Sequence, residues 1–143
     1  MPDSTPPHDA HCHCGAVRIR IAAQPEFMNE CNCSLCRKSG GVWGYYDPKD
    51  VHIDGKTSAY ERADYPEPAV RIQFCPTCGV TTHWTLTEDF AAKNPREANR
   101  MGVNMRIFCD TAKSGVELRF PDGKNWDGKE DYGYYREAEV YRA

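Results

Sequence analysis

Seven of the eight cysteines in this chain of 143 residues lie in three short clusters with the spacing of metal ligands. The clusters are a C-x-C pair, a C-x-C-x-x-C triple and a C-x-x-C turn: Cys12-His13-Cys14, Cys31-Asn32-Cys33-Ser34-Leu35-Cys36 and Cys75-Pro76-Thr77-Cys78-Gly79. In the turn, the proline and the following glycine favour a backbone that points N–H groups at the sulfurs, which is a common zinc-binding arrangement. One such turn is a weak signal, but the three clusters together are a strong one.

The seven cysteines divide naturally into a set of four and a set of three. Zinc takes four tetrahedral ligands in a structural site and keeps one position open to water or substrate in a catalytic site. This division predicts two Zn²⁺ ions, a structural ion held by Cys12, Cys14, Cys75 and Cys78 and a catalytic, more labile ion held by Cys31, Cys33 and Cys36. Spacing leaves a second division open, in which the C-x-C pair combines with two members of the triple.

An open zinc position can support three kinds of chemistry. The ion can hold a thiol deprotonated at neutral pH, where free thiols with a pKa of about 8.5 are mostly protonated. It can instead polarise a carbonyl oxygen or activate water. We favour delivery of sulfur, because three thiolate ligands donate electron density and weaken the Lewis acidity of the ion. Folding should depend on metal, since structural zinc contributes on the order of 10 kcal/mol in small domains.

The composition indicates the cellular compartment of the protein and excludes some classes of partner. The first ten residues are polar and rich in proline, whereas an export signal needs an apolar core. A reducing compartment favours metal ligation over disulfides, so we predict a cytoplasmic protein with reduced cysteines. The net charge of -3 offers no basic field for nucleic acid, and no apolar run approaches the roughly 18 residues of a membrane span. We therefore expect neither nucleic acid nor a membrane as a partner, and the oligomeric state stays open.

Short strands are the elements that must position the cysteines. Val17, Ile19 and Ile21 alternate with two arginines, as in a half-buried strand. Turn residues separate this strand from seven further predicted strands at 42–46, 57–62, 70–74, 80–86, 102–109, 116–120 and 134–141. Helical patterns cover only 34–39 and 88–98. The length suits one domain, so we predict a mainly β domain over 11–143 that follows a disordered leader at 1–10.

The cysteine clusters and their flanks resemble the glutathione-dependent formaldehyde-activating enzyme family, also called S-(hydroxymethyl)glutathione synthase-like, which includes centromere protein V. The matching stretches are 12–18 (CHCGAVR), 31–41 (CNCSLCRKSGG), 74–79 (FCPTCG) and 102–106 (GVNMR). Residues 122–126 (DGKNW) resemble a C-terminal feature of the short bacterial members. The triple with its Arg-Lys-Ser-Gly-Gly tail is the most specific element.

This resemblance implies a β-tent fold of stacked antiparallel sheets that zinc staples together. It also implies the four-plus-three division of the cysteines, with a closed zinc site and a catalytic zinc site. The implied reaction joins glutathione and formaldehyde to S-hydroxymethylglutathione, and its reverse is a carbon–sulfur lyase reaction. A small thiol such as glutathione is the implied partner.

The residues that follow the triple are candidates for binding this thiol. Arg37 and Lys38 supply positive charge for an anionic peptide, and Ser39, Gly40 and Gly41 could bring backbone N–H groups to a carboxylate. The alternative is a turn that only closes the metal loop. Three aromatic residues on the next strand are candidates for either a pocket wall or the core: Trp43, Tyr45 and Tyr46.

Four histidines and the remaining cysteine complete the candidates. His11 and His13 alternate with the C-x-C pair, so in an extended segment they point away from the metal. His52 or His83 could serve the open site as an acid or base, although a satisfied or exposed histidine is commoner. Cys109 is expected to be a buried thiol at a strand end. Its alternative is a fourth ligand for the triple, which would close the catalytic site.

Two functional hypotheses follow. The first is an enzyme of the carbon–sulfur lyase type that handles a thiol or a thiol adduct at the triple. The second is a non-catalytic module, stapled by zinc, that binds a protein or peptide. An enzyme requires an open metal position, whereas the module requires two metal ions with all positions filled. The sequence leaves the substrate itself undetermined.

Overall fold

The computed structural model describes residues 6–129 and 131–142, which form a mainly β structure of two sheets. The smaller sheet has the antiparallel order β1-β2-β5. Its strands are β1 (His8–His11), β2 (Arg18–Ile21) and β5 (Val51–Asp54). Ile19 and Ile21 are buried on its inner face, and the arginines that alternate with them, Arg18 and Arg20, are exposed, as the alternation predicts.

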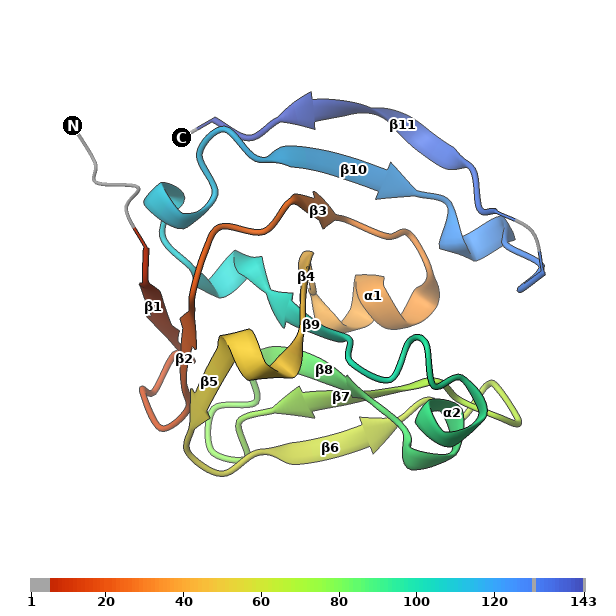
Figure 1. Cartoon of the computed structure of the whole chain (residues 1–143), viewed down its shortest axis with the longest axis horizontal. Helices are drawn as coiled ribbons and strands as arrows, with labels where there is room; N and C mark the ends of the chain where they lie inside the picture. The colour runs from red at the N-terminus through yellow and green to blue at the C-terminus, as the bar shows by residue number, and fades with distance from the viewer. Residues whose placement is uncertain (1–5, 130, 143) are drawn as a thin grey trace.

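The larger sheet has eight strands in the order β11-β10-β3-β4-β9-β8-β7-β6. In chain order they are β3 (Phe27–Asn29), β4 (Trp43–Tyr46), β6 (Ser58–Glu61), β7 (Val70–Phe74), β8 (Thr81–Leu86), β9 (Met101–Asn104), β10 (Glu117–Pro121) and β11 (Tyr134–Val140). Neighbouring strands are antiparallel except β3 and β10, which are parallel. Figure 1 shows β11, β10 and β3 on one side of the molecule and β8, β7 and β6 on the other, with α1 between them.

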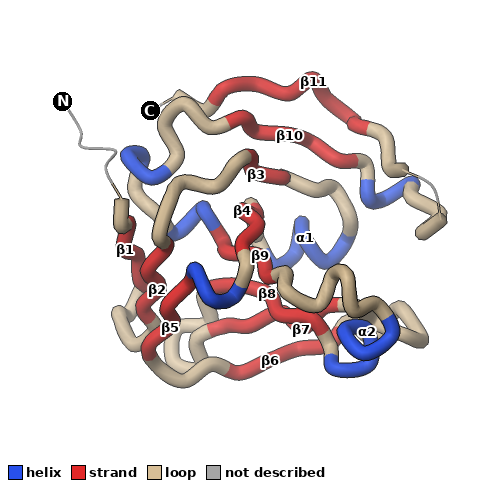
Figure 2. Tube along the Cα trace, in the orientation of Figure 1, coloured by secondary structure: helices blue, strands red, loops and turns tan. Residues whose placement is uncertain are grey.

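The helices are short, and loops carry much of the chain between the strands (Figure 2). The two α-helices are α1 (Ser34–Ser39) and α2 (Glu88–Lys93). The 3-10 helices are η1 (Pro48–Asp50), η2 (Met105–Ile107), η3 (Asp110–Ala112) and η4 (Gly123–Asn125). Within the described ranges, none of the helices has the length and apolar character needed to cross a bilayer.

Buried side chains form three clusters. The largest joins the two sheets and includes Ile19, Met28 and Val103. A second surrounds the buried Cys12 and Cys75, and a third lies on the eight-stranded sheet and consists of two indole rings and an isoleucine: Trp43, Trp84 and Ile72. Burial of each large apolar side chain contributes about 1.5–3 kcal/mol. The second and third clusters place apolar surroundings beside the cysteine clusters.

The structure confirms the mainly β class and corrects several boundaries. β7 has the predicted bounds, but β1, β3 and β5 were missed because they are short and lie in segments rich in polar residues or proline. Residues 8–10 of the predicted leader are ordered, since His8–His11 pairs with β2, while residues 1–5 lie outside the described residues. The strand predicted over 102–109 ends at Asn104, whose side chain accepts a hydrogen bond from the Arg106 N–H at 3.1 Å and starts η2.

Candidate metal centres and active site

Four cysteine sulfurs lie close together where the two sheets approach each other. They are within 4.8 Å of one another and belong to Cys12, Cys14, Cys75 and Cys78. The sulfur of Cys14 lies 3.7 Å from that of Cys12 and 3.7 Å from that of Cys75. A zinc ion with Zn–S bonds of about 2.3 Å requires a tetrahedral edge of about 3.8 Å between sulfurs. The spacing of this four-sulfur cluster therefore fits zinc.

Backbone N–H groups support the sulfurs of the four-sulfur cluster. The Val17 N–H donates to Cys12 Sγ at 3.3 Å, and the Thr77 N–H donates to Cys75 Sγ at 3.4 Å. Gly79 adopts a φ of 77°, and its N–H donates to the Cys75 carbonyl at 2.9 Å, which closes the turn. Donated hydrogen bonds favour the thiolate form that metal binding needs. Because Cys12 follows β1 and Cys75 follows β7, the cluster joins the small sheet to the large one.

A three-sulfur cluster lies at the start of α1. The sulfurs of Cys31, Cys33 and Cys36 are within 4.8 Å of one another. Cys33 is the N-cap of α1, and its sulfur accepts a hydrogen bond from the Cys36 N–H at 3.4 Å. Cys31 Sγ accepts from the Cys33 N–H at 3.4 Å, and Cys36 Sγ accepts from the Trp43 indole N–H at 3.3 Å. Among the described residues, no histidine or carboxylate joins either cluster.

The electrostatics of the three-sulfur cluster favour a cation. Hydrogen bonds from Cys31 and then Cys36 lower the pKa of Cys33. The hydrogen bond to Cys33 raises the pKa of Cys31, and the hydrogen bonds with Cys31 and Cys33 raise that of Cys36. Three thiols this close do not all ionise unless positive charge compensates them. The donor set and its spacing therefore suit a divalent ion that prefers sulfur ligands.

The three-sulfur cluster lines an apolar pocket of about 260 Å³, which we call the sulfur pocket. Its aromatic walls come from segments far apart in the sequence: Trp43, Tyr45, Tyr65, Trp84, Trp126 and Tyr132. Arg62 also lines it, as does Asn29. Apolar walls with a few polar groups are typical of ligand sites. This cluster, unlike the first, opens onto a space of ligand size.

Strand alternation decides which predicted aromatics reach the sulfur pocket. Trp43 and Tyr45 lie on the same face of β4 and line it. Tyr46 faces the other way, where its hydroxyl donates to the Ala23 carbonyl at 2.8 Å. The pocket-wall interpretation is therefore right for two of the three residues. Gly41 is a glycine because a Cβ there would overlap the Trp43 ring.

Several known proteins are similar to this chain in sequence or in structure. The sequence model of a family described as "Glutathione-dependent formaldehyde-activating enzyme" matches residues 7–94. The chain is 38% identical over 126 residues to a Halomonas elongata protein provisionally named a glutathione-dependent formaldehyde-activating enzyme, with 77% of this chain and 80% of that protein covered. The chain belongs to the glutathione-dependent formaldehyde-activating enzyme family. A crystal structure of a Rhodobacter sphaeroides protein has a TM-score of 0.54 and 27% identity, with 69% of this chain and 85% of that chain covered.

In this family member, the Arg-Lys-Ser-Gly-Gly tail lies beside the sulfur pocket but does not line it. Gly40 ends α1 with a φ of 74°, and its N–H donates to the Cys36 carbonyl at 3.1 Å. That N–H is thus used inside the turn. Lys38 and Ser39 line an adjoining pocket of about 490 Å³, and Arg62 lines both pockets. Arg37 and Gly41 line neither of these two pockets.

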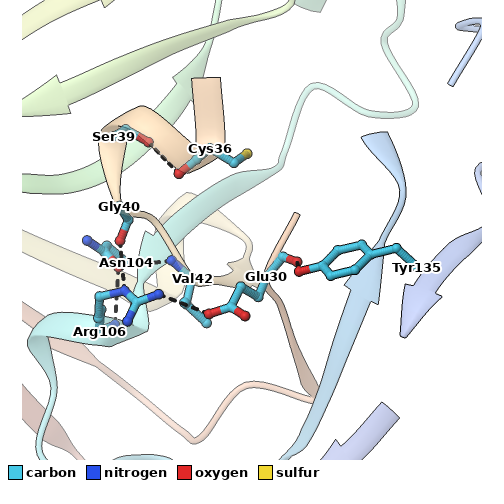
Figure 3. Close-up of polar contacts among 8 residues, drawn as sticks. All are labelled: Glu30, Cys36, Ser39, Gly40, Val42, Asn104, Arg106 and Tyr135. Carbon is cyan, nitrogen blue, oxygen red and sulfur yellow. Dashed lines mark hydrogen bonds and ion pairs between the residues drawn. The ribbon is translucent and has the colours of Figure 1, made fainter. Parts of the chain in front are cut away.

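Arg106 braces both ends of the loop that carries the three-sulfur cluster (Figure 3). Its Nε donates to the Gly40 carbonyl at 3.0 Å, and its Nη2 donates to Glu30 Oε1 at 2.9 Å. Glu30 directly precedes the first cysteine of the cluster, and its carbonyl accepts from the Tyr135 hydroxyl at 3.0 Å. The 102–106 motif that the sequence singled out thus holds the metal loop in place.

A C-terminal loop covers the other side of the three-sulfur cluster. The buried Asn32 donates from Nδ2 to Asp122 Oδ1 at 2.8 Å and accepts at Oδ1 from the Lys124 N–H at 2.9 Å. These bonds bring the backbone so close that a Cβ on Gly123 would lie 2.5 Å from Cys31 Sγ. This loop, together with Trp126 and Tyr132, lies beyond the residues that the family model matches.

The histidines and the eighth cysteine lie outside both clusters and the sulfur pocket. His83 is buried on the face of β8 opposite Trp84, and burial lowers its pKa to about 4. His52 is exposed on β5, and the imidazole of His11 lies 2.6 Å from the Cys12 carbonyl oxygen. Cys109 is exposed, which corrects the prediction of a buried thiol. The chain leaves the sheet at Asn104 and passes through 3-10 turns, so Cys109 is not at a strand end.

Sequence reasoning missed Arg62, Asn29, Trp84 and Tyr65 as parts of the site. Arg62 and Tyr65 lie in a connection that carries no motif, and Asn29 ends a strand that was not predicted. A signal for Trp84 was available, because it alternates with threonine and histidine on a predicted strand and had to face one side of the sheet. Their joint position depends on the folding of the eight-stranded sheet.

Proposed function

We propose that this chain is a zinc-dependent enzyme of the carbon–sulfur lyase type, which acts on a thiol or thiol adduct at the three-sulfur cluster. The reaction is the reversible joining of glutathione and formaldehyde to S-hydroxymethylglutathione. One observation carries this proposal: three sulfurs spaced for one metal ion line a pocket, and the described chain offers no fourth ligand. Membership of the family supports glutathione and formaldehyde as reactants.

The two clusters have different roles in this proposal. The four-sulfur cluster would hold a structural zinc, and Cys31, Cys33 and Cys36 would hold the catalytic one. When bound there, zinc supplies a site at which a substrate thiol stays deprotonated at neutral pH. The N–H donors on the three cysteine sulfurs, including the Trp43 indole, hold the ligands in position. We place the protein in the cytoplasm, where thiols stay reduced.

Arg62 is positioned to hold a carboxylate of the thiol substrate. Its guanidinium donates two hydrogen bonds of 2.7 Å to Asp64 and stacks 3.8 Å from the centre of the Tyr65 ring. The Arg62 side chain is 12% exposed and lines both pockets, whereas the Asp64 side chain is 52% exposed and lines only the adjoining one of these two pockets. Glutathione carries two carboxylates, which charged and polar side chains can bind. Beyond Arg62, the adjoining pocket offers two further polar side chains, Lys38 and Ser39.

The reaction requires little covalent chemistry from the protein. The sulfur forms a bond to the carbonyl carbon, the π electrons move to the oxygen, and the proton released by the thiol ends on that oxygen. Thiols add to aldehydes without a catalyst, so positioning of the reactants is the main contribution of the site. The aromatic walls of the sulfur pocket place apolar surface around the reacting groups.

Metal analysis and thiol titration test this function. We expect two zinc ions per chain, and in the cobalt-substituted protein glutathione should change the thiolate-to-cobalt absorption band. The matched control ligand is the glutathione analogue that carries a methyl group in place of the thiol, which should leave the band unchanged. A single metal per chain, or two metals with a band that no thiol alters, would rule out thiol chemistry and favour the non-catalytic binding module.

A further inference from the structure

Asn29 and Tyr45 place a polar pair in the otherwise apolar wall of the sulfur pocket. Asn29 ends β3 and Tyr45 lies on the adjacent β4, and both side chains line the pocket. Asn29 Nδ2 donates to the Tyr45 hydroxyl oxygen at 2.7 Å. Asn29 is only 3% exposed, and its side-chain oxygen Oδ1 has no hydrogen-bond partner within the described part of the chain.

An unpaired amide oxygen at this depth needs an explanation. A buried polar atom left without a partner costs about 1–3 kcal/mol, and nearly all such atoms in folded proteins are paired. The hydrogen bond between Asn29 and Tyr45 links β3 to β4, which is a structural role. That role does not explain why the amide oxygen of Asn29 is left unpaired. Turning the amide over exchanges its oxygen and nitrogen and leaves the nitrogen unpaired instead. In either orientation, one buried polar atom in the pocket wall has no partner among the described residues and is free to pair with a ligand.

The Tyr45 hydroxyl is fixed in place and neutral. Its oxygen accepts from Asn29, so its own hydrogen remains for another acceptor. Burial raises the pKa of Tyr45, so the group stays protonated at neutral pH. The ring packs 5.5 Å from Phe27 and 6.1 Å from Trp84, and the Arg100 guanidinium lies 5.4 Å above it. The ring therefore holds the hydroxyl in one orientation.

We infer that Asn29 and Tyr45 bind the oxygen of the thiol adduct, so that the pocket selects adducts with a hydroxyl on the carbon attached to sulfur. This inference rests on the proposed function. Tyr45 donates a hydrogen bond to the carbonyl oxygen while the carbon–sulfur bond forms and negative charge develops on that oxygen. The oxygen then takes the proton released by the thiol, and the new hydroxyl donates to Asn29 Oδ1. Tyr45 keeps its own proton throughout.

Paired ligands test the inference by binding alone. S-hydroxymethylglutathione, maintained by excess formaldehyde, and S-ethylglutathione, measured in the same formaldehyde, have the same number of heavy atoms and differ in one terminal hydroxyl. Calorimetry on the zinc-loaded full chain should show a preference for the hydroxyl ligand of about tenfold to a hundredfold. Tyr45→Phe and Asn29→Leu should each reduce this preference at least fivefold. Tyr46→Phe is the matched control, since it removes a hydroxyl from the same strand on the face away from the pocket.

Kinetics provide a second measurement. Tyr45→Phe should lower kcat for the joining of glutathione and formaldehyde by about tenfold or more, because it removes one donor from the developing charge. Its affinity for glutathione in the cobalt-substituted protein should stay within twofold of the wild type. Equal binding of the two ligands by the wild type, or a preference that survives in both variants, overturns this inference alone. If neither ligand nor glutathione binds, the proposed function fails and the inference fails with it.

Discussion

The two cysteine clusters use the same ligand atoms and the same backbone support, but they differ in their surroundings. Cys12 and Cys75 are fully buried between turns of two sheets, and the chain itself supplies the fourth sulfur there. The three-sulfur cluster is half-buried, lies on one short helix and loop, and faces a pocket. Under the proposed function, the presence or absence of a fourth sulfur, more than the type of ligand, would separate a structural metal site from a reactive one.

The largest expected effect comes from removing a ligand of the four-sulfur cluster. Cys75→Ser should cost much of the roughly 10 kcal/mol that a structural zinc contributes, which is comparable to the whole stability of a domain. We therefore expect this variant to lose its folded circular dichroism spectrum at 25 °C. A folded Cys75→Ser protein with an unchanged melting temperature would contradict a structural role for the four-sulfur cluster.

The matching change in the three-sulfur cluster should leave the fold intact. Cys36→Ser removes one of three ligands beside the pocket, where no second sheet depends on the metal. We expect one zinc per chain, a near-native spectrum, and loss of the glutathione-induced change in the cobalt band. Unfolding of this variant to the same extent as Cys75→Ser would contradict a reactive role for the cluster.

We expect acid to lower the free energy of unfolding through His83 as well as through protonation of the cysteine sulfurs. Burial lowers the folded pKa of His83 to about 4 from an ordinary value of 6.5, so below pH 6.5 the unfolded chain binds a proton that the folded chain does not. This contribution to stability is present above the unfolded pKa and is lost as the pH falls toward the folded pKa. Between pH 7 and pH 5 the loss should be about 2 kcal/mol.

The variant His83→Gln separates this effect from protonation of the cysteines. It leaves both clusters in place, so the acid sensitivity of the metal sites should be unchanged, while the part due to His83 disappears. Denaturant unfolding at both pH values measures the difference. Parallel pH curves for the wild type and His83→Gln would show that His83 plays no part in acid sensitivity.

The smallest of these effects tests the loop that covers the three-sulfur cluster. Gly123→Ala places a Cβ 2.5 Å from Cys31 Sγ, so either the loop or the sulfur must shift. We expect glutathione affinity to fall about fivefold to tenfold, close to 1 kcal/mol, with the melting temperature little changed. Gly133→Ala is the matched control, because a Cβ there meets no atom within 4 Å. An equal response of the two variants would exclude a role for the loop in shaping the site.

Local patterns predicted the strands that carry clear alternation and the short helix at the triple. They failed for β3, where three residues follow a proline, and for β1, which lies in a segment read as a leader. A strand this short has almost no periodicity of its own and forms because its neighbours supply hydrogen-bond partners. The same limit applied to Cys109, whose exposure depends on where the chain leaves the sheet.

The sequence by itself determined that seven sulfurs have the spacing of metal ligands, because the C-x-C and C-x-x-C spacings are local geometry. It also determined the family, since the matching motifs are continuous stretches of chain. Only the tertiary structure decided that four sulfurs gather between the sheets while three face a pocket. It also decided that Arg62, Asn29 and Trp126 share that pocket, because residues nearly 100 positions apart meet only when the eight-stranded sheet folds around α1.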